Sequence, residues 1–439
     1  MGELPTNLLA LGVFLGVFGA VLVRQLLDRG PPVWSLFALG ALGTVATGLL
    51  TPELAAGAVW GSASVLVFLL SLFLFARALQ DAGALAHLAR WLVGLAPRAE
   101  ELPVVLFLGF GLAAAFLVND ALVVIGVPVL LAVALRLRVP ARPLLLTLAF
   151  AVTVGSALTP FGNPQNLLVA AASGLRAPVA TFLRYLLVPT AANLVVGAYY
   201  LRWRFRRELQ GGTGAPAAPE ARIRLLPTGG WGPRLRREPV LAIFPATVAA
   251  LIGFGVASSV VPIAEVPDWL IAGVGAVALL AVSPSRSTVL RRVNWEILVL
   301  FAGLFVVVAG VVHGGLVRAV EAHVALPGPA HPIEGLATIV GTSLVGPQLV
   351  SNVPWVGIEI PTLIAAGYSS STPIAWVGLA AASTLAGNVT LLGAASNLIV
   401  ADLGERAGVR IGLRTFVRDA LPIAAISLGI LFACLVVGV

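Results

Sequence analysis

The sequence predicts an all-α polytopic membrane protein, and three observations predict this class. Of the 439 residues, 59% are hydrophobic and only 10% are charged, whereas soluble domains contain about 25% charged residues. The mean hydropathy is +1.02. The apolar residues form continuous runs that suit membrane-spanning helices of about 20 residues. These runs are apolar on every side, which excludes the alternating pattern of an outer-membrane β-barrel.

The apolar runs fall into two halves that are joined by an Arg-rich stretch. The first half contains the runs 7–23, 33–50, 54–76, 102–135, 143–172 and 179–201, and the second contains 239–261, 268–283, 295–313, 333–366, 374–401 and 418–438. We therefore predict a first repeat over 1–201, a cytoplasmic linker over 202–238 and a second repeat over 239–439. Each repeat would hold five spans and one re-entrant hairpin, at 102–135 and 333–366.

The fourth and fifth runs of each half carry polar interruptions. The fourth run is too long for one span and is interrupted by Asn119-Asp120 in the first half and by Ser351-Asn352 in the second. This pattern predicts a helical hairpin whose tip lies within the membrane. The fifth run is broken by 155–166 (GSALTPFGNPQN) and by 387–397 (GNVTLLGAASN), which predicts a discontinuous helix. Irregular backbone at this depth requires surrounding protein or a water-filled cavity to satisfy it.

The two halves are related in sequence. With an offset of 233, Asn119 aligns with Asn352 and Pro128 aligns with Pro361. With an offset of 231, the shared pattern T-x-x-G-x-x-x-N aligns Thr159, Gly162 and Asn166 with Thr390, Gly393 and Asn397. These matches predict an internal repeat with discontinuous helices at the membrane midplane.

The arginines predict the orientation of the chain. All 27 basic residues are Arg, and a cytoplasmic linker places all but Arg176, Arg184 and Arg318 in cytoplasmic loops. The positive-inside rule then predicts both termini outside and two oppositely oriented halves, which is an inverted repeat. The expected location is an inner (plasma) membrane of bacterial or archaeal type. The net charge of +8 reflects this topology, so we expect contacts with anionic lipid headgroups and no nucleic-acid partner.

An inverted repeat with paired broken helices is the architecture of secondary transporters. Exposed helix N-termini attract anions, and unwound carbonyls attract cations. The candidate substrate- or ion-binding residues all lie at the four polar interruptions. They are Asn119, Asp120, Gly155, Ser156, Thr159, Gly162, Asn163, Asn166, Ser351, Asn352, Gly387, Asn388, Thr390, Gly393, Ser396 and Asn397. The alternative is a local role, because Asn suits hairpin turns and Asn, Ser and Thr cap half-helices.

Two acidic residues are candidates for proton coupling. Asp120 lies at the first tip, where an unpaired carboxylate is costly and usually marks an ion or proton route. The alternative is that it only caps the second arm of the hairpin. Glu359 lies on an apolar arm of the second hairpin and could carry a proton or hold a structural position. No cofactor is expected, and the coupling ion would be H⁺ or Na⁺. The candidate sodium ligands are Asn119, Asn163, Asn352 and Asn388.

These motifs resemble those of the ion transporter superfamily over nearly the whole chain. Ser351-Asn352 and residues 162–166 (GNPQN) are similar to the hairpin tip and helix break of divalent-anion:sodium symporters, although Val353 replaces the expected Thr. Asn119-Asp120 is closer to the tip of arsenite permeases and D-type sodium–proton antiporters. The superfamily also includes citrate transporters. The resemblance implies ten spans, two hairpins, transport of a small anion and, as in many members, a homodimer.

The functional prediction is a secondary active transporter of a small anion, either an inorganic oxyanion or a carboxylate. Transport would be coupled to protons or sodium by alternating access. The alternative is a sodium–proton antiporter from the same superfamily. A channel is a further alternative, because broken helices also line pores. We do not expect an enzyme, because Cys434 is isolated and His313, His323 and His331 lie at the outer end of one span and in the following loop.

Overall fold

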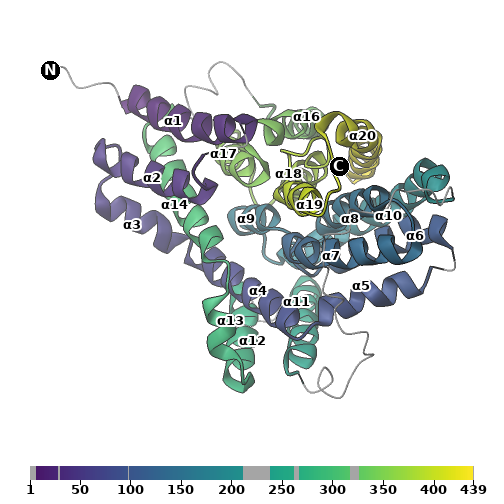
Figure 1. The fold of residues 1–439 in the computed structure, drawn as a ribbon. Coiled ribbons are helices and arrows are strands. Elements are labelled where there is room, and N and C mark those ends of the chain that lie inside the picture. The colour runs from purple at the N-terminus through teal and green to yellow at the C-terminus, as the bar shows by residue number, and fades with distance from the viewer. Residues whose placement is uncertain are drawn as a thin grey trace.

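The computed structural model describes residues 6–27, 30–96, 98–210, 238–261, 266–316 and 326–438. Its regular structure within these ranges is entirely helical (Figure 1). Eight of the described helices are long and apolar enough to cross a membrane. The all-α, multi-pass prediction is therefore confirmed.

The described helices follow one another in two halves. The first half contains α1 (Thr6–Leu27), α2 (Val33–Ala46), α3 (Pro52–Gly61), α4 (Ala63–Asp81), α5 (Ala84–Gly94), η1 (Ala99–Glu101), α6 (Leu102–Ala114), α7 (Asn119–Leu137), α8 (Ala141–Ser156), α9 (Pro164–Ala172) and α10 (Pro178–Gln210). The second contains α11 (Val240–Val260), α12 (Asp268–Val282), α13 (Arg286–Arg291), α14 (Trp295–His313), α16 (Pro332–Val350), α17 (Asn352–Ala365), α18 (Pro373–Ala386), α19 (Ala395–Arg406) and α20 (Leu413–Val437).

The polar interruptions lie where the helices end and begin. The first hairpin consists of α6 and α7, and α7 begins at Asn119. The second consists of α16 and α17, and α17 begins at Asn352. The fifth run of each half is broken, between α8 and α9 and between α18 and α19. The local sequence explains one restart, because Pro164 suits a first helical position and the Asn163 side chain caps the Asn166 N–H at 2.8 Å.

Two boundaries differ from the sequence-based expectation. The run 54–76 is not one helix, because the chain turns at Ser62 between α3 and α4. Helix α10 continues to Gln210, past the predicted start of the linker at residue 202. Phe205 and Leu209 are buried in this extension, so its arginines belong to an amphipathic helix end and not to a linker. Residues 211–237 of the predicted linker lie outside the described residues.

Contacts between the halves occur in matching pairs. Helix α2 packs on α14, and α4 packs on α12. Among the broken helices, α9 packs on both α17 and α18, whereas α19 packs on both α7 and α8. This reciprocity agrees with the internal repeat. The opposite orientation of the two halves relative to a membrane stays a prediction.

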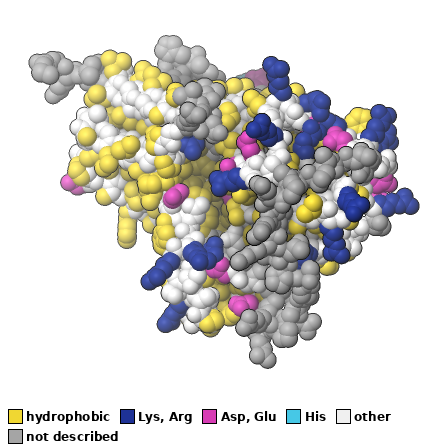
Figure 2. Space-filling model, viewed as in Figure 1, with side chains coloured by type: hydrophobic (Ala, Val, Ile, Leu, Met, Phe, Trp, Pro, Cys, Tyr) yellow, Lys and Arg dark blue, Asp and Glu magenta, His cyan; other side chains and the backbone are white. Residues whose placement is uncertain are grey.

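The broken helices form the centre of the molecule. Every residue of α8 from Pro143 to Ser156 and every residue of α18 from Ala375 to Ala386 is buried. Peripheral helices instead expose large apolar side chains, such as Leu39, Leu42 and Trp60, which are 62%, 66% and 83% exposed. Figure 2 shows such hydrophobic surface over α1–α3 and α14, with arginines gathered toward α5, α6 and α10. This surface suits contact with lipid.

An ion cluster around the buried Asp419 joins α8, α10 and α20. The Asp419 carboxylate is fully buried and lies 2.6 Å from Arg204 Nη2 and 3.3 Å from Arg142 Nη2. Arg418 Nε also lies 3.3 Å from Asp419. Glu208 pairs with both Arg142, at 3.3 Å, and Arg204, at 3.2 Å. The cluster explains why the end of α10 is helical, since Arg204 and Glu208 both lie in the extension.

Asp419→Asn should markedly lower the thermal stability of the protein in detergent. Removing one partner from a buried ion pair costs about 3–5 kcal/mol, because the remaining charges lose their compensation. The control is Asp402→Asn, which breaks an exposed pair with Arg406 on one helix, a pair type worth about 0.3–0.5 kcal/mol. Equal shifts in Tm for the two variants would show that the cluster has no special role in stability.

Candidate functional site

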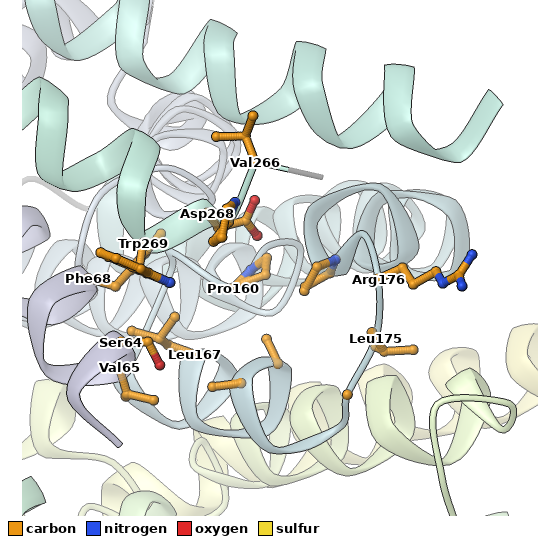
Figure 3. Close-up of a pocket in the computed structure, with 15 residues that line it drawn as sticks. Ser64, Val65, Phe68, Pro160, Leu167, Leu175, Arg176, Val266, Asp268 and Trp269 are labelled. Atoms are coloured by element: carbon orange, nitrogen blue, oxygen red, sulfur yellow. The ribbon is translucent and has the colours of Figure 1, made fainter. Parts of the chain in front are cut away.

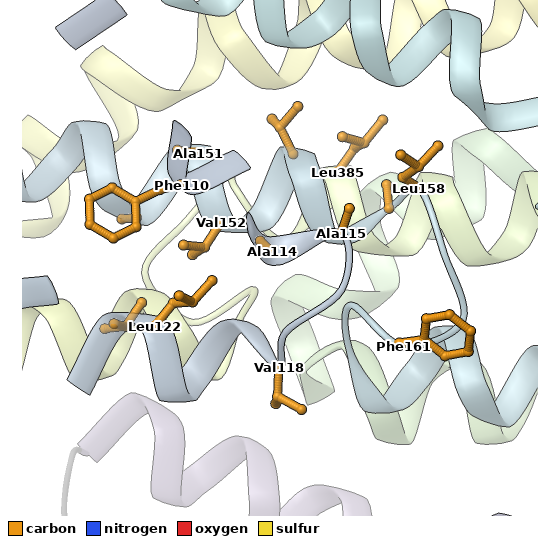
Figure 4. Close-up of a cluster of buried hydrophobic side chains, with 14 of the residues drawn as sticks. Phe110, Ala114, Ala115, Val118, Leu122, Ala151, Val152, Leu158, Phe161 and Leu385 are labelled. Atoms are coloured by element: carbon orange, nitrogen blue, oxygen red, sulfur yellow. The ribbon is translucent and has the colours of Figure 1, made fainter. Parts of the chain in front are cut away.

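The first hairpin tip is bonded to the first helix break. The Asn119 N–H donates to the Gly162 carbonyl at 3.2 Å. The Thr159 hydroxyl donates to the carbonyl of Ala115, at the end of α6. Figure 4 shows Val118 on the turn between α6 and α7 and Phe161 on the loop between α8 and α9. Movement of the hairpin tip away from the α8–α9 loop would therefore require the loss of these hydrogen bonds.

The second tip and break are bonded in the equivalent way. With the Asn352 side-chain amide oriented so that both of its polar atoms are paired, its Nδ2 donates to the Gly393 carbonyl at 2.7 Å and to the Ser383 carbonyl at 3.0 Å. The Thr390 hydroxyl donates to Gln348 Oε1 at 2.8 Å. Gln348 occupies the position equivalent to Ala115, so a side chain replaces a backbone carbonyl as the acceptor.

Two asparagine amides hold the unwound backbone of the breaks. Asn166 Nδ2 donates to the Ser156 carbonyl at 2.9 Å and to the Thr159 carbonyl at 3.1 Å. At the equivalent position, Asn397 Nδ2 donates to the Gly387 carbonyl at 2.8 Å and to the Thr390 carbonyl at 3.5 Å. These bonds satisfy carbonyls that the helix ends leave without partners.

Thr384 of α18 links the two halves at the centre of the molecule. Its hydroxyl has two acceptors within reach, the Ala380 carbonyl at 2.7 Å and Asn166 Oδ1 at 2.9 Å, and it accepts from Asn163 Nδ2 at 3.2 Å and Gln165 Nε2 at 3.4 Å. Gln165 Nε2 also lies 3.1 Å from the Asn352 side-chain oxygen. The first break therefore contacts both α18 and the second hairpin tip.

Close backbone approach explains the glycines of the site. A Cβ on Gly155 would collide with the carbonyl of Gly111, where α8 packs against α6. A Cβ on Gly393 would lie 2.7 Å from both the Gly387 carbonyl and Gln348 Oε1. Gly162 is equally enclosed, by the backbone of Ser156 and Ala114. Only glycine allows these chains to approach so closely.

The second tip is strained. Ser351 has φ 70° and ψ 163°, a conformation that is almost restricted to glycine and costs about 1–3 kcal/mol. It immediately precedes Asn352, the first residue of α17. Such strain persists only where the surrounding structure imposes it, and the bonds of Asn352 supply that constraint.

Several oxygens at the second break have no hydrogen-bond partner. Asn388 Oδ1, Ser396 Oγ and Asn397 Oδ1 are buried and unpaired in the described structure. Asn388 is oriented by its amide nitrogen, which donates to the Phe150 carbonyl at 3.3 Å. Amide and hydroxyl oxygens are ligands for hard cations. Asn388 is one of the predicted sodium ligands, whereas Ser396 and Asn397 were predicted only as general site residues.

Two cavities open beside the first tip and break. One, of about 300 Å³, is lined by Phe68 of α4, Pro160 of the break and Asp268 and Trp269 of α12 (Figure 3). The other, of about 330 Å³, lies at the opposite end of α4 and reaches Asp120. Asp120 is half-buried, and its carboxylate has no hydrogen bond or ion pair within the described part of the chain.

One predicted residue lies apart from the others. Glu359 is buried on α17, the second arm of the second hairpin. No bond of the tip–break network includes it.

Three residues of the network were not predicted as site residues from the sequence. Gln165 lies within the GNPQN motif, and Thr384 aligns with Thr153 in the repeat, so the sequence contained an indication of both. Gln348 carried a weaker one, as an amide on an otherwise apolar hairpin arm.

A helical fold that crosses a membrane several times, with polar residues gathered at breaks in its central helices, defines a membrane transporter. Residues 26–386 match the family model described as "Citrate transporter", so the chain belongs to the citrate transporter family. The predicted relationship to citrate-transporter-like proteins is confirmed. The family and its relatives are transporters and not enzymes.

Sequence relatives agree with this assignment. The chain is 30% identical to an uncharacterised transporter of Mycobacterium tuberculosis over 387 residues, which cover 85% of each protein. It is 28% identical to the silicon efflux transporter of Oryza sativa subsp. japonica, over 75% of this chain and 76% of that protein.

Two solved structures share the fold. The YdaH transporter of Alcanivorax borkumensis has a TM-score of 0.61 at 17% identity and covers 99% of this chain and 98% of its own. MtrF of Neisseria gonorrhoeae has a TM-score of 0.56 at 14% identity, over 99% and 95% of the two chains. At these identities, the likeness concerns the fold alone.

Thr384→Val should lower both stability and transport, because Asn163 Nδ2 and Gln165 Nε2 lose their acceptor on α18 and Asn166 Oδ1 loses its contact with the hydroxyl. An unsatisfied buried polar group costs about 1–3 kcal/mol. Thr147→Val is the matched control, since Thr147 is equally buried on α8 but bonds only to the Pro143 carbonyl of its own helix. Thermal melting and substrate flux would be compared. Equal effects in the two variants would exclude a special role for the link between the halves.

Proposed function

We propose that the protein is a secondary active transporter of a small anion, an inorganic oxyanion or a carboxylate, coupled to protons by alternating access. One observation carries the proposal. Hydrogen bonds connect both hairpin tips and both helix breaks into one network at the centre of an otherwise apolar molecule. In secondary transporters, substrate and ion sites lie where such discontinuous helices meet.

Four helix N-termini support an anionic substrate. Helices α7, α9, α17 and α19 all begin at a tip or a break, and each N-terminus contributes the positive end of a helix dipole. The candidate residues at these positions would complete the binding shell with amides and hydroxyls. Membership of a family described as citrate transporters supports a carboxylate among the substrates.

Asp120 supports proton coupling. It is placed at the first tip and reaches a cavity, and its carboxylate has no bonded partner among the described residues. A carboxylate in the membrane interior is costly when charged, by about 2.5–3.5 kcal/mol at a helix centre on insertion scales. Binding and release of a proton would relieve this cost during the transport cycle. Glu359, which is buried on α17, is the second proposed proton carrier, and the alternative is a structural position on this arm.

The positions of the arginines support an inner (plasma) membrane location with residues 211–237 cytoplasmic and both termini outside. Arg142, Arg204 and Arg418 of the ion cluster would then lie at the cytoplasmic side, in agreement with the positive-inside rule. A homodimer remains part of the proposal, on the basis of the superfamily resemblance.

Asp120→Asn should abolish the stimulation of anion uptake by a pH gradient. The protein would be reconstituted in proteoliposomes, and uptake of labelled citrate, or of the oxyanion or carboxylate that most raises its Tm, would be measured with and without the gradient. Glu334→Gln, which changes an exposed carboxylate on α16, should behave as the wild type. Unchanged gradient dependence in Asp120→Asn would disprove proton coupling through this residue.

The second candidate function is a sodium–proton antiporter, which the unpaired oxygens at the second break favour. Adding sodium to anion-free proteoliposomes would then release protons, and Asn388→Ala would reduce this release. Asn193→Ala is the control, because Asn193 Oδ1 is also buried and unpaired but lies on α10, where its amide bonds to the Ser427 carbonyl. Sodium-independent behaviour of the wild type would eliminate this candidate.

A further inference from the structure

The cavity that reaches Asp120 has an unusual distribution of charge. It lies between the C-terminal end of α4, the N-terminus of α7 and the loop that precedes α14, and it has a volume of about 330 Å³. Its polar lining consists of Arg77, Gln80, Asp120, Arg292 and Asn294. The rest of the lining is largely apolar, with Phe73, Val124 and Ile297 among its residues. Charged side chains therefore face a space whose walls are mainly apolar and which is open to solvent beside the exposed Arg292 and Asn294.

The two arginines of the cavity differ in their partners. Arg77 Nε donates to Asp81 Oδ2 at 3.1 Å, and Arg77 Nη1 donates to Gln80 Oε1 at 3.1 Å, so its charge is largely compensated. The Arg292 guanidinium has no hydrogen bond or ion pair with any described residue. Arg292 therefore presents an uncompensated positive charge to the cavity.

Helix ends add to the positive potential. Asn294 is the N-cap residue of α14 and its side chain makes no capping bond, while the acidic residue in the first turn of this 19-residue helix, Glu296, is exposed and does not line the cavity. The N-terminus of α7 lies on the opposite side, with Asp120 in its first turn. Both helix dipoles place their positive ends at the cavity.

Asp120 is the cavity's only acidic lining residue in the described structure. The other charged groups on helices that pack against α7 are engaged elsewhere or lie outside the lining: Arg142 bonds to Asp419, Asp402 to Arg406 and Glu405 to Arg410, and His87 and Arg90 of α5 do not line it. The net charge facing the cavity is thus set by Arg292 and by the protonation of Asp120. With Asp120 ionised, the two charges cancel, and with Asp120 protonated, one positive charge remains.

We propose that this cavity is an anion-binding vestibule, in which Arg292 attracts a small oxyanion or carboxylate and Asp120 binds a proton when the anion enters. The proposal rests on the proposed function and names the residues that would connect its two ligands. An ionised Asp120 repels an anion in the same cavity, and a protonated one does not. Anion and proton therefore favour each other's binding, which is the requirement for moving them together. The volume suits a small ligand.

The electrostatic part of the proposal is testable without knowledge of the substrate. Cys434 is the single cysteine of the chain, so Cys434→Ala provides a thiol-free background. A new thiol at Ala121, which lines the cavity, would be reacted with the anionic sulfonatoethyl and the cationic trimethylammonium-ethyl methanethiosulfonates. The measured quantity is the ratio of the anionic to the cationic rate, which cancels the intrinsic reactivity of the thiol.

Arg292→Gln should lower this ratio severalfold, and Asp120→Asn should raise it severalfold. Arg286→Gln is the matched control, because Arg286 is exposed on the neighbouring α13 and does not line the cavity, so its ratio should equal that of the parent. Val124→Cys provides a second reporter on the same cavity, in case Ala121→Cys fails to fold. Equal ratios for Arg292→Gln and Arg286→Gln, or absence of reaction at both reporters, would overturn the proposal.

The outcome is separable from that of the flux experiment. Thiol modification is measured on the protein in detergent and requires no transport. Charge-selective modification together with unchanged gradient dependence in Asp120→Asn would support the vestibule and disprove proton coupling through Asp120. Loss of gradient dependence without charge-selective modification would support the proposed transport function and disprove the vestibule.

Discussion

The structure depends on the satisfaction of backbone groups where its two central helices are broken. Within a membrane, each unpaired N–H or carbonyl costs several kcal/mol. Asn166 and Asn397 supply the required donors, each to two carbonyls of its own break. Since α8 and α18 are buried along their central lengths, the helices packed around them take their positions from these breaks.

The same scaffold carries different chemistry in its two halves. The first tip has Asp120 where the second has Val353, and the first break has Asn163 and Gln165 where the second has Ala394 and Ser396. The first break is consequently well bonded, and Thr384 closes it from the other half. The second break retains unpaired oxygens. The first half thus has a protonatable group at its hairpin tip, and the second half has unpaired oxygens at its helix break.

Helix α4 connects the site to the two cavities. Its N-terminal part lines the cavity beside Pro160, and its C-terminal part lines the cavity that reaches Asp120. Phe68, which lines the first of these cavities, stacks on Phe161 of the first break, with ring centroids 5.6 Å apart. The break is therefore held by apolar contact with α4 as well as by hydrogen bonds to the hairpin tip. A movement that changed access to either cavity would have to alter this aromatic contact.

The sequence by itself determined the helical class, the positions of both tips and both breaks and the family, because runs of apolar residues and their few polar interruptions are properties of local sequence. It also indicated Asp120 as the exceptional charge. Only the tertiary structure decided which interruptions meet. The bonds of Thr384, Gln165 and Gln348 depend on helices far apart in the chain, and the positive charge of Arg292 reaches Asp120's cavity only through packing of α14 near α4 and α7. The extension of α10 to Gln210 likewise depends on ion pairs with Asp419. This residue lies on α20, far from α10 in the chain, so the local sequence around the arginines of α10 does not predict these pairs.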